Sequence, residues 1–318
     1  MQTMNAVTFE APGTPSVLSL NRVASPTGAP GHVVAEQAYA DVNFGDVLYR
    51  RYGIYPAQSP PYVVGYGGAG VVCEVGRSNS GFAAGERVAY IARAGGYAER
   101  IAIPASQVVP LPPTIDLRAA AALVVAGTAA HEMLETAALS AGSTILVHGA
   151  AGGVGSFLVQ LAHRRGLRPI AAVSSEEKAA FARDCGAADV VVTSDPGAWS
   201  AVAARVDAVF DSVGAAVGEV NLAALRRSGT ILVYGAISGP ASFDSFALMQ
   251  KSLTVRGFAL FEHLETWPAT MRTLFAQVEV GDLRVPVRRV FPLAEAAAAH
   301  ALLEARGVVG KILLSVPA

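Results

Sequence analysis

A turn made almost entirely of glycine and alanine, residues 149–155 (GAAGGVG), follows an apolar run and precedes an amphipathic stretch. Ala150, Gly152 and Gly155 occupy the three positions of the pattern G-x-G-x-x-G. Between a strand and a helix, this pattern is typical of dinucleotide binding, because bare backbone can approach a pyrophosphate and free N–H groups face its charge. A tight turn without a ligand is the alternative. The residues expected to contact the cofactor are Ala151, Gly152, Gly153 and Val154.

The end of the next apolar run, residues 168–175, helps to choose between NADH and NADPH. An NAD site usually has Asp or Glu at this place to bind the ribose 2′-hydroxyl. Here the run ends in Ser174 and Ser175, and Lys178, one of only three lysines, follows one helical turn later. Serine hydroxyls and an ammonium suit a 2′-phosphate, so we predict NADPH. Lys178 could instead be a solvated surface charge.

Polar and aromatic residues gather in residues 41–58, DVNFGDVLYRRYGIYPAQ. Tyr49, Tyr52 and Tyr55 are amphipathic side chains that could stack on a planar acceptor and hydrogen-bond to it. The alternative for each tyrosine is a half-buried packing role. This stretch is the predicted wall of the substrate site.

Three charged residues of the same stretch have other expected roles. Asp46 is expected to cap or brace the loop. Arg50 and Arg51 either steer an anionic acceptor or belong to a solvated face, where ion pairs contribute little.

Six apolar runs separated by helical patterns must position these residues. Runs that are apolar on both faces and alternate with helices predict a parallel sheet of βαβ units, and six such strands match a doubly wound dinucleotide fold. Ligands of these sheets bind at the carboxyl ends of the strands. The predicted strands are residues 144–149, 168–175, 188–193, 206–212, 229–236 and 252–260.

Residues 1–110 have a different pattern, with short alternating runs between glycine and proline turns, which predicts an all-β, barrel-like unit. A helical pattern covers 114–140, and the strand-like run 310–316 lies in a tail expected to return to the first unit. A ligand crevice is expected between the two domains. The predicted domains are 1–122 with 261–318 (catalytic) and 123–260 (dinucleotide-binding).

Composition excludes several classes of protein. With 52% hydrophobic and 15% charged residues, the chain is not disordered. A net charge of −1 gives no basic excess for nucleic acid or an anionic membrane. The N-terminus has no signal-peptide pattern, and the longest uncharged apolar run, 119–130, is too short to span a membrane. We therefore predict a cytoplasmic protein without nucleic-acid or membrane partners.

Motifs along essentially the whole chain carry a family resemblance. The most specific are VHGAAGGVGSFLVQLA (147–162) and VSSEEKAAFARDCGAADVVV (173–192), with GDVLYRR (45–51), GTAAHEML (127–134) and GKILL (310–314) in the same order. They resemble the medium-chain dehydrogenase/reductase superfamily, specifically its zinc-independent quinone oxidoreductase (zeta-crystallin-like) branch. The resemblance implies an α/β protein with a GroES-like β-barrel catalytic domain and a Rossmann domain containing a doubly wound, parallel six-stranded sheet.

The resemblance also implies site residues. Asn43 matches a polar residue near the nicotinamide and is assigned, with Tyr49 and Tyr55, to catalysis. Thr128 should also lie near the nicotinamide, and Lys311 either reaches the cofactor or is a surface charge at a strand edge. The remaining implied cofactor contacts follow the fourth, fifth and sixth strands: Ser212, Val213, Gly214, Gly235, Ala236, Ile237, Phe258, Ala259 and Leu260.

Zinc-dependent members of the superfamily have a Cys early in the first domain, a Gly-His-Glu later and a further Cys. Asn43 stands in the region of the first Cys, and Gly65-Tyr66-Gly67 stands where Gly-His-Glu would fall. Catalytic zinc needs three protein ligands, and no histidine has a partner at ligand spacing, so we predict no metal. His131 and His148 are expected to be structural.

The chemistry expected of a site without metal is hydride transfer from NADPH to an electron-poor carbon, because the acceptor's oxygen then needs only hydrogen-bond donors. The predicted function is an NADPH-dependent quinone oxidoreductase. The alternatives are an enoyl or enone reductase (alkenal or polyketide type) and a non-catalytic NADPH-binding protein. No lysine follows a tyrosine at Tyr-x-x-x-Lys spacing, which excludes short-chain reductases. The sixth strand is an apolar sheet edge, and with the resemblance it predicts a homodimer.

Overall fold

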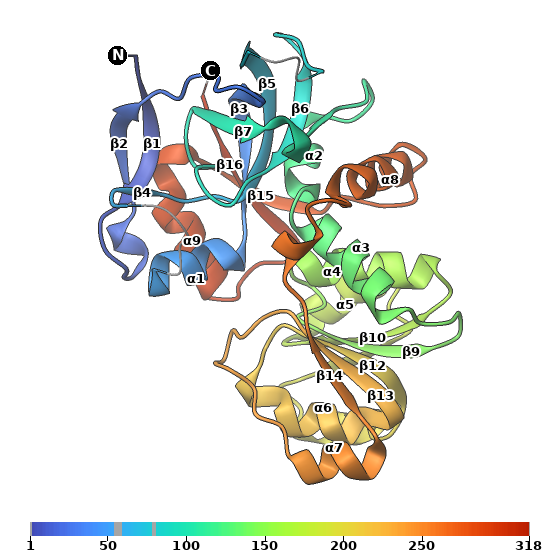
Figure 1. Cartoon of the computed structure of the whole chain (residues 1–318). Coiled ribbons are helices and arrows are strands. Elements are labelled where there is room, and N and C mark those ends of the chain that lie inside the picture. Colours follow the sequence, from blue (N-terminus) through green and yellow to red (C-terminus); the bar gives the residue numbers. More distant parts are fainter. Residues whose placement is uncertain (1, 54–58, 78–80, 318) are drawn as a thin grey trace. The chain divides into compact units, whose positions relative to one another are not determined.

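The structure is a computed structural model, and it describes residues 2–53, 59–77 and 81–317. The chain forms two compact units, each with its own sheets (Figure 1). Unit 1 contains both ends of the chain, whereas unit 2 is one continuous segment. Unit 1 comprises Met1–Thr128 and Phe261–Ala318, and unit 2 comprises Ala129–Leu260.

Unit 2 is built on a parallel six-stranded sheet in the order β11-β10-β9-β12-β13-β14. The chain starts in the middle, builds one half and returns to build the other, which confirms the predicted doubly wound fold. Helices α4 and α5 lie over one face and α6 and α7 over the other (Figure 1). The elements are β9 (Thr144–His148), α4 (Gly153–Arg164), β10 (Arg168–Val173), α5 (Glu176–Asp184), β11 (Asp189–Val192), η3 (Pro196–Val202), β12 (Val206–Asp211), η4 (Ala215–Val217), α6 (Gly218–Ala224), β13 (Leu225–Val233), α7 (Ser245–Lys251) and β14 (Thr254–Gly257).

The apolar runs form strands because both faces of this sheet are covered. Leu146, Ile170 and Val209 from three neighbouring strands are buried in one cluster. The last strand is shorter than predicted, because Leu253 N donates to Leu248 O and so completes the end of α7.

Unit 1 contains a seven-stranded sheet in the order β15-β16-β3-β5-β6-β8, with β7 also paired to β3, and a three-stranded sheet in the order β2-β1-β4. The long strand β3 is central: β7 pairs with its first half and β16 with its second half. This confirms the GroES-like fold. The elements are β1 (Thr3–Phe9), η1 (Pro15–Val17), β2 (Ser19–Ala24), β3 (His32–Val42), α1 (Phe44–Tyr52), β4 (Tyr62–Val63), β5 (Gly67–Val75), β6 (Arg87–Ile91), β7 (Arg100–Pro104), η2 (Ala105–Gln107), β8 (Val108–Pro110), α2 (Leu117–Leu123), α8 (Trp267–Glu279), β15 (Val287–Pro292), η6 (Leu293–Glu295), α9 (Ala296–Glu304) and β16 (Lys311–Ser315). Two elements cross the unit boundaries: α3 (Ala126–Ala137) and η5 (Leu260–His263).

The helical pattern predicted over 114–140 forms two helices, α2 and α3, rather than one. The carbonyl of Val124 lies at the break, where it accepts hydrogen bonds from Thr128 Oγ1 (2.9 Å) and Trp267 Nε1 (3.2 Å). These side-chain bonds satisfy a carbonyl at the end of α2. The buried Thr128 hydroxyl therefore has a structural partner.

None of the described helices is by itself long and apolar enough to cross a membrane; α2 and α3 meet that test only when taken together.

Candidate active site

Asp41, Asn43 and Lys311 form a buried polar cluster in unit 1, where β3 and β16 pair. Asn43 directly follows β3, and Lys311 begins β16, whose next residue pairs with Val42. Nζ of Lys311 lies 2.6 Å from Asp41 Oδ1 and donates to Asn43 Oδ1 over 2.8 Å. Lys311 is only 2% exposed, so it is not the strand-edge surface charge that the sequence allowed.

Asp46 fixes the backbone of Asn43 at the start of α1. Asn43 N donates to Asp46 Oδ2 over 2.8 Å, which confirms the bracing role predicted for this carboxyl. Burial raises the pKa of Asp46 to about 7, with a further rise from the Asp41 charge, although the Asn43 N–H lowers it. The Tyr97 hydroxyl lies 3.4 Å from the same Oδ2 and 3.1 Å from His300 Nε2, so polar contacts continue into the core.

The three predicted acceptor-site tyrosines have different environments. Tyr49 is 1% exposed, and its ring packs edge-on against Phe9 and Tyr66. Burial raises the pKa of Tyr49 above its ordinary value, so its hydroxyl stays protonated. Tyr52 is 59% exposed, and Tyr55 lies outside the described residues. The packing reading therefore fits Tyr49 better than it fits Tyr52.

Arg50 neither steers an acceptor nor belongs to a solvated face, so both predicted roles are wrong. Its side chain is fully buried, with Nη2 2.5 Å from Glu304 Oε1 and Nη1 donating to Gly13 O over 2.9 Å. The pair ties α1 to α9. Arg51 is exposed, and its guanidinium lies 5.7 Å from the centre of the Tyr52 ring.

An aromatic wall of Tyr49, Tyr66 and Phe261 starts from α1, the helix whose N-cap is Asn43. The ring centres of Tyr66 and Phe261 are 5.2 Å apart. A Cβ at Gly45 would lie 2.7 Å from the Tyr66 ring, so this ring rests on the first turn of α1. Sequence reasoning gave Tyr66 no role beyond noting that Gly65-Tyr66-Gly67 stands where zinc-dependent members have Gly-His-Glu.

The glycines of the turn after β9 differ in why the fold needs a glycine at each position. Gly149 has a φ of +61° and accepts a hydrogen bond from Gly152 N over 2.8 Å. A Cβ at Gly155 would clash with the Gly149 carbonyl oxygen and lie 2.7 Å from Ala150 Cα. A Cβ at Gly152 would meet only Gly149 O, at 3.2 Å. The protein therefore requires Gly155 for its own packing, whereas a Cβ at Gly152 would press on a single backbone oxygen.

The other residues predicted to bind the cofactor in this turn are Ala151, which precedes the N-cap of α4, and Gly153 and Val154 in its first turn. Gly153 and Val154 are partly exposed, and Ala151 is buried. The first bond from the cap of this helix runs from Ser156 N to Gly152 O over 3.0 Å. The N–H groups before Ser156 have no partner within the helix, and such groups bind anions.

Ser174 and Lys178 are brought together just after β10. Lys178 Nζ donates to Ser174 Oγ over 2.9 Å. Ser175 caps α5, and its hydroxyl accepts a hydrogen bond from Lys178 N over 3.4 Å. The side chains at this strand end thus combine an ammonium with a hydroxyl.

The remaining residues predicted in unit 2 follow three adjacent strands at the carboxyl edge of the sheet. Ile237 N donates to Ser212 O over 3.3 Å, and a Cβ at Gly235 would lie 2.7 Å from that same oxygen. Phe258 N donates to Val233 O over 2.9 Å. The residues at this edge are Ser212, Val213, Gly235, Ala236, Ile237, Phe258, Ala259 and Leu260.

A buried hydrogen-bond chain supports this edge. His148 Nε2 lies 2.7 Å from Asn221 Oδ1, and Asn221 Nδ2 donates to Asp211 Oδ2 over 2.9 Å. The other oxygen of Asp211 accepts a hydrogen bond from Val213 N over 2.7 Å. Burial lowers the pKa of His148, so the ring is neutral near pH 7. His148 therefore has the structural role predicted for it, and Asp211 and Asn221 are contributors that sequence reasoning missed.

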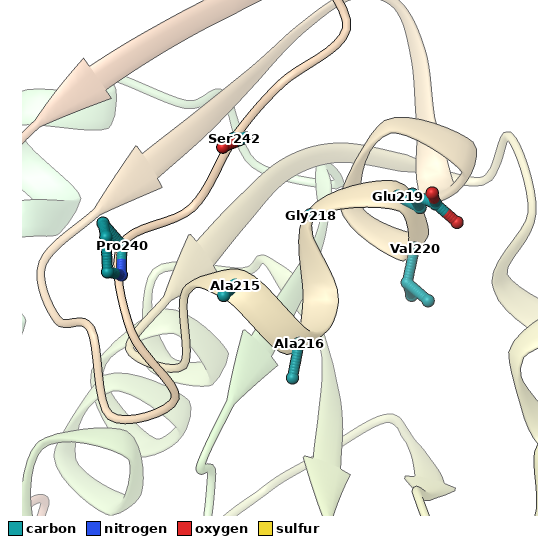
Figure 2. A pocket seen from close by; sticks show the side chains of 7 residues that line it. All are labelled: Ala215, Ala216, Gly218, Glu219, Val220, Pro240 and Ser242. Carbon is teal, nitrogen blue, oxygen red and sulfur yellow. The ribbon is translucent and has the colours of Figure 1, made fainter.

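A hollow of about 390 Å³ lies outside this edge, between the start of α6 and the segment after β13 (Figure 2). It contains one charged residue, Glu219, whose carboxylate points away from Pro240 (Figure 2). None of the predicted cofactor contacts belongs to it. The residues that line it are Ala215, Ala216, Gly218, Glu219, Val220, Pro240 and Ser242.

Potential metal ligands are dispersed in the described parts of the chain. His131 Nε2 lies 3.9 Å from Glu135 Oε1, and burial lowers the pKa of His131. Across residues 2–53, 59–77 and 81–317, no three His, Cys, Asp or Glu side chains are grouped to hold an ion.

Comparison with known proteins agrees with this architecture. Residues 29–113 match the model of the alcohol dehydrogenase GroES-like domain, and residues 153–276 match that of the zinc-binding dehydrogenases. A quinone oxidoreductase of Pseudomonas aeruginosa is 35% identical over 320 residues, covering 97% of this chain and 98% of that protein. The chain belongs to the medium-chain dehydrogenase/reductase superfamily, in its quinone oxidoreductase branch.

Other members of this superfamily are similar over a comparable length. The crystal structure of Escherichia coli quinone oxidoreductase with NADPH superposes with a TM-score of 0.93 at 30% identity, covering 98% of this chain and 99% of that one. A 2-haloacrylate reductase of a Burkholderia species is 34% identical over 314 residues, and this alignment covers 92% of each of the two chains. Within the superfamily, relatives of this chain thus bear the names of both quinone and acrylate reductases.

Proposed function

We propose that the protein is an NADPH-dependent reductase that transfers hydride to quinones or related electron-poor acceptors without a metal. The observation that carries this proposal is the full-length similarity to quinone oxidoreductases, one of them crystallised with NADPH. The polar cluster of unit 1 and the carboxyl edge of the sheet in unit 2, each taken by itself, are consistent with it. A cytoplasmic location stays a prediction from the sequence.

The residues at the carboxyl edge of the six-stranded sheet fit a dinucleotide. A Cβ at Gly152 would meet only one protein atom, Gly149 O, and Gly152 leaves this space unfilled beside the N–H groups that begin α4. A pyrophosphate would occupy this space and accept hydrogen bonds from those groups. Ser212 and Ile237, which follow the adjacent strands β12 and β13, would flank the nicotinamide end of the dinucleotide.

Unit 1 would supply the groups around the acceptor. Bound NADPH supplies a hydride from its reduced nicotinamide ring. Asn43 would donate a hydrogen bond to the acceptor's carbonyl oxygen, where negative charge develops as the hydride arrives. The aromatic wall would hold a planar acceptor by stacking and exclude water.

We propose hydride transfer without a metal because of the groups at Asn43. Lys311 Nζ donates a hydrogen bond to Asn43 Oδ1 over 2.8 Å, so this oxygen is not free to bind a metal ion and a positive charge lies beside it. The amide is left with N–H donors, which do not bind cations, and the ammonium repels a second cation.

The proposed activity is tested by NADPH oxidation, with 1,4-naphthoquinone and a panel of small enones compared side by side. Higher kcat/KM with the quinone supports the proposal, and higher kcat/KM with an enone or acrylate supports the second candidate, an enone reductase. That candidate is favoured by the similarity to 2-haloacrylate reductase. NADPH binding with no turnover of any acceptor would support a non-catalytic protein.

Replacing Lys178 by Ala should weaken NADPH binding about 10- to 100-fold and leave NADH binding unchanged. The loss corresponds to roughly 1.5–3 kcal/mol for a charge-assisted hydrogen bond to the 2′-phosphate, which NADH lacks. Fluorescence titration with both nucleotides measures the difference. Arg183→Ala, which removes a cation at the other end of α5, is the control and should change neither affinity. Equal losses for the two nucleotides would contradict this role.

We also propose that the protein is a homodimer formed through the edge strand β14. Val255 on this strand and Phe246 and Met249 on α7 are 38%, 58% and 66% exposed. Light scattering at micromolar concentration should give twice the 32.7 kDa chain mass. Val255→Lys should shift the protein toward monomer, because it places a charge on the edge. Leu20→Lys, on the edge strand of another sheet, should not. A monomeric wild type would contradict the proposal.

A further inference from the structure

The amide of Asn43 is oriented by a buried cation. Lys311 Nζ donates to its Oδ1 over 2.8 Å. The same ammonium lies 2.6 Å from Asp41 Oδ1, so a counter-ion holds the charge in place. A flipped amide would place N–H groups against the ammonium, and that contact is repulsive in a buried site, so one orientation is strongly favoured.

The backbone of Asn43 is fixed independently of its side chain. Its N–H donates to Asp46 Oδ2 over 2.8 Å, and the preceding residue, Val42, pairs with Ile312 on β16. Neither the backbone nor the amide can therefore rotate without leaving a buried polar group unpaired.

This orientation leaves a buried group of Asn43 incomplete. Among the described residues, Asn43 Nδ2 is buried and has no hydrogen-bond partner. The amide nitrogen carries two hydrogens, so it is a donor that an oxygen from a bound molecule would complete, because buried donors are almost always paired.

Lys311 is 2% exposed, and its own neighbours hold the charged group. Its Nζ donates to Asn43 Oδ1 over 2.8 Å and to Val42 O over 3.4 Å, and it forms an ion pair with Asp41 Oδ1 at 2.6 Å. The geometry favours a role through Asn43 over the cofactor contact that the sequence suggested.

We propose that Lys311, with Asp41 as its counter-ion, is a positioning residue that holds Asn43 as a hydrogen-bond donor to the carbonyl oxygen of the hydride acceptor. The inference rests on the proposed function and deepens it, because it assigns the substrate class. Acceptors must present a carbonyl oxygen next to the carbon system that receives the hydride, and the ion pair fixes the donor toward it.

The test compares the wild type with Lys311→Met and with the double variant Asp41→Asn/Lys311→Met, which avoids leaving an unpaired buried carboxyl. Steady-state kinetics with 1,4-naphthoquinone, NADPH titration by fluorescence, and thermal melts are measured on each protein. Kinetics with NADPH deuterated at the transferred position give the primary isotope effect.

In the folded variants we expect kcat to fall about 10- to 100-fold, because a misplaced donor no longer meets the developing charge. KM for the quinone and Kd for NADPH should stay within about threefold, and the isotope effect on kcat should rise as hydride transfer becomes slower than other steps. A purely structural role would lower kcat only with the folded fraction and leave the isotope effect unchanged. That result, an unchanged kcat, or a tenfold weaker Kd for NADPH would overturn the inference.

A second measurement does not depend on any variant. In a crystal structure of the wild type with NADPH and a quinone, Asn43 Nδ2 should lie within about 3.2 Å of a quinone carbonyl oxygen. A quinone bound without this contact overturns the inference and leaves the proposed function intact. A wild type that turns over no quinone or enone overturns both.

Discussion

Replacing Asn43 by Asp should lower kcat for 1,4-naphthoquinone about 100- to 1,000-fold at pH 8, which is the loss typical of removing one donor from an oxyanion site. The two side chains have the same shape, but the donor nitrogen becomes a carboxylate oxygen. That oxygen repels the charge that develops on the acceptor. Lys311, 2.8 Å from the present Oδ1, would stabilise the new carboxylate, so the protein should still fold.

The pH dependence distinguishes the loss of a donor from general damage. Burial raises the pKa of the neighbouring Asp41 to about 6 and that of Asp46 to about 7. Burial and the neighbouring carboxylates should raise the pKa of a carboxyl at position 43 as well, against the opposing charge of Lys311, and a protonated carboxyl donates a hydrogen bond. The ratio of variant to wild-type kcat should rise as the pH falls from 8 to 5.5.

Asn21→Asp serves as the control, because it changes an exposed asparagine of unit 1 in the same chemical way. It should leave kcat and its pH profile unchanged. A deficit in the Asn43 variant that is equally large at every pH would argue against a donor role, and a matching loss of NADPH binding would move the contact to the cofactor.

The strands of unit 2 could be predicted because their signal is local. The run at residues 144–149 is apolar on both faces and ends in a glycine turn, and these two features define β9 and the start of α4. The bracing role of Asp46 was also predictable, because Asp46 is only three residues from Asn43. Interactions over one helical turn depend little on the rest of the fold.

The polar cluster could not be predicted in the same way. Asn43 and Lys311 are 268 positions apart, and they meet only because β16 pairs with β3 in one register. The same holds for the buried Arg50, whose partner Glu304 is 254 positions away. From sequence alone, we expect each of these cations either to be a solvated charge or to contact a ligand. Pairing across the sheet and between helices determines their burial.

Replacing Gly152 by Ala and replacing Gly155 by Ala should have different effects: the first should weaken NADPH binding, and the second should lower Tm. Gly152→Ala should weaken NADPH binding tenfold or more while changing Tm by less than about 2 °C, because its methyl enters the space proposed for the pyrophosphate. In the protein itself that methyl would meet only Gly149 O, at 3.2 Å. The φ of −82° at Gly152 suits any residue, so no backbone strain is expected.

Gly155→Ala should instead destabilise the protein by about 1–3 kcal/mol, which corresponds to a Tm several degrees lower. Its methyl would clash with the Gly149 carbonyl oxygen and with Ala150 Cα. Both are backbone atoms of the turn, so they cannot move aside as a flexible side chain could. Thermal melts without nucleotide, followed by NADPH titration of each folded variant, separate the two effects. If Gly152→Ala lowers Tm as much as Gly155→Ala and binds NADPH normally, then both glycines of the turn serve packing alone. The phosphate site would then have to lie elsewhere on the carboxyl edge of the sheet.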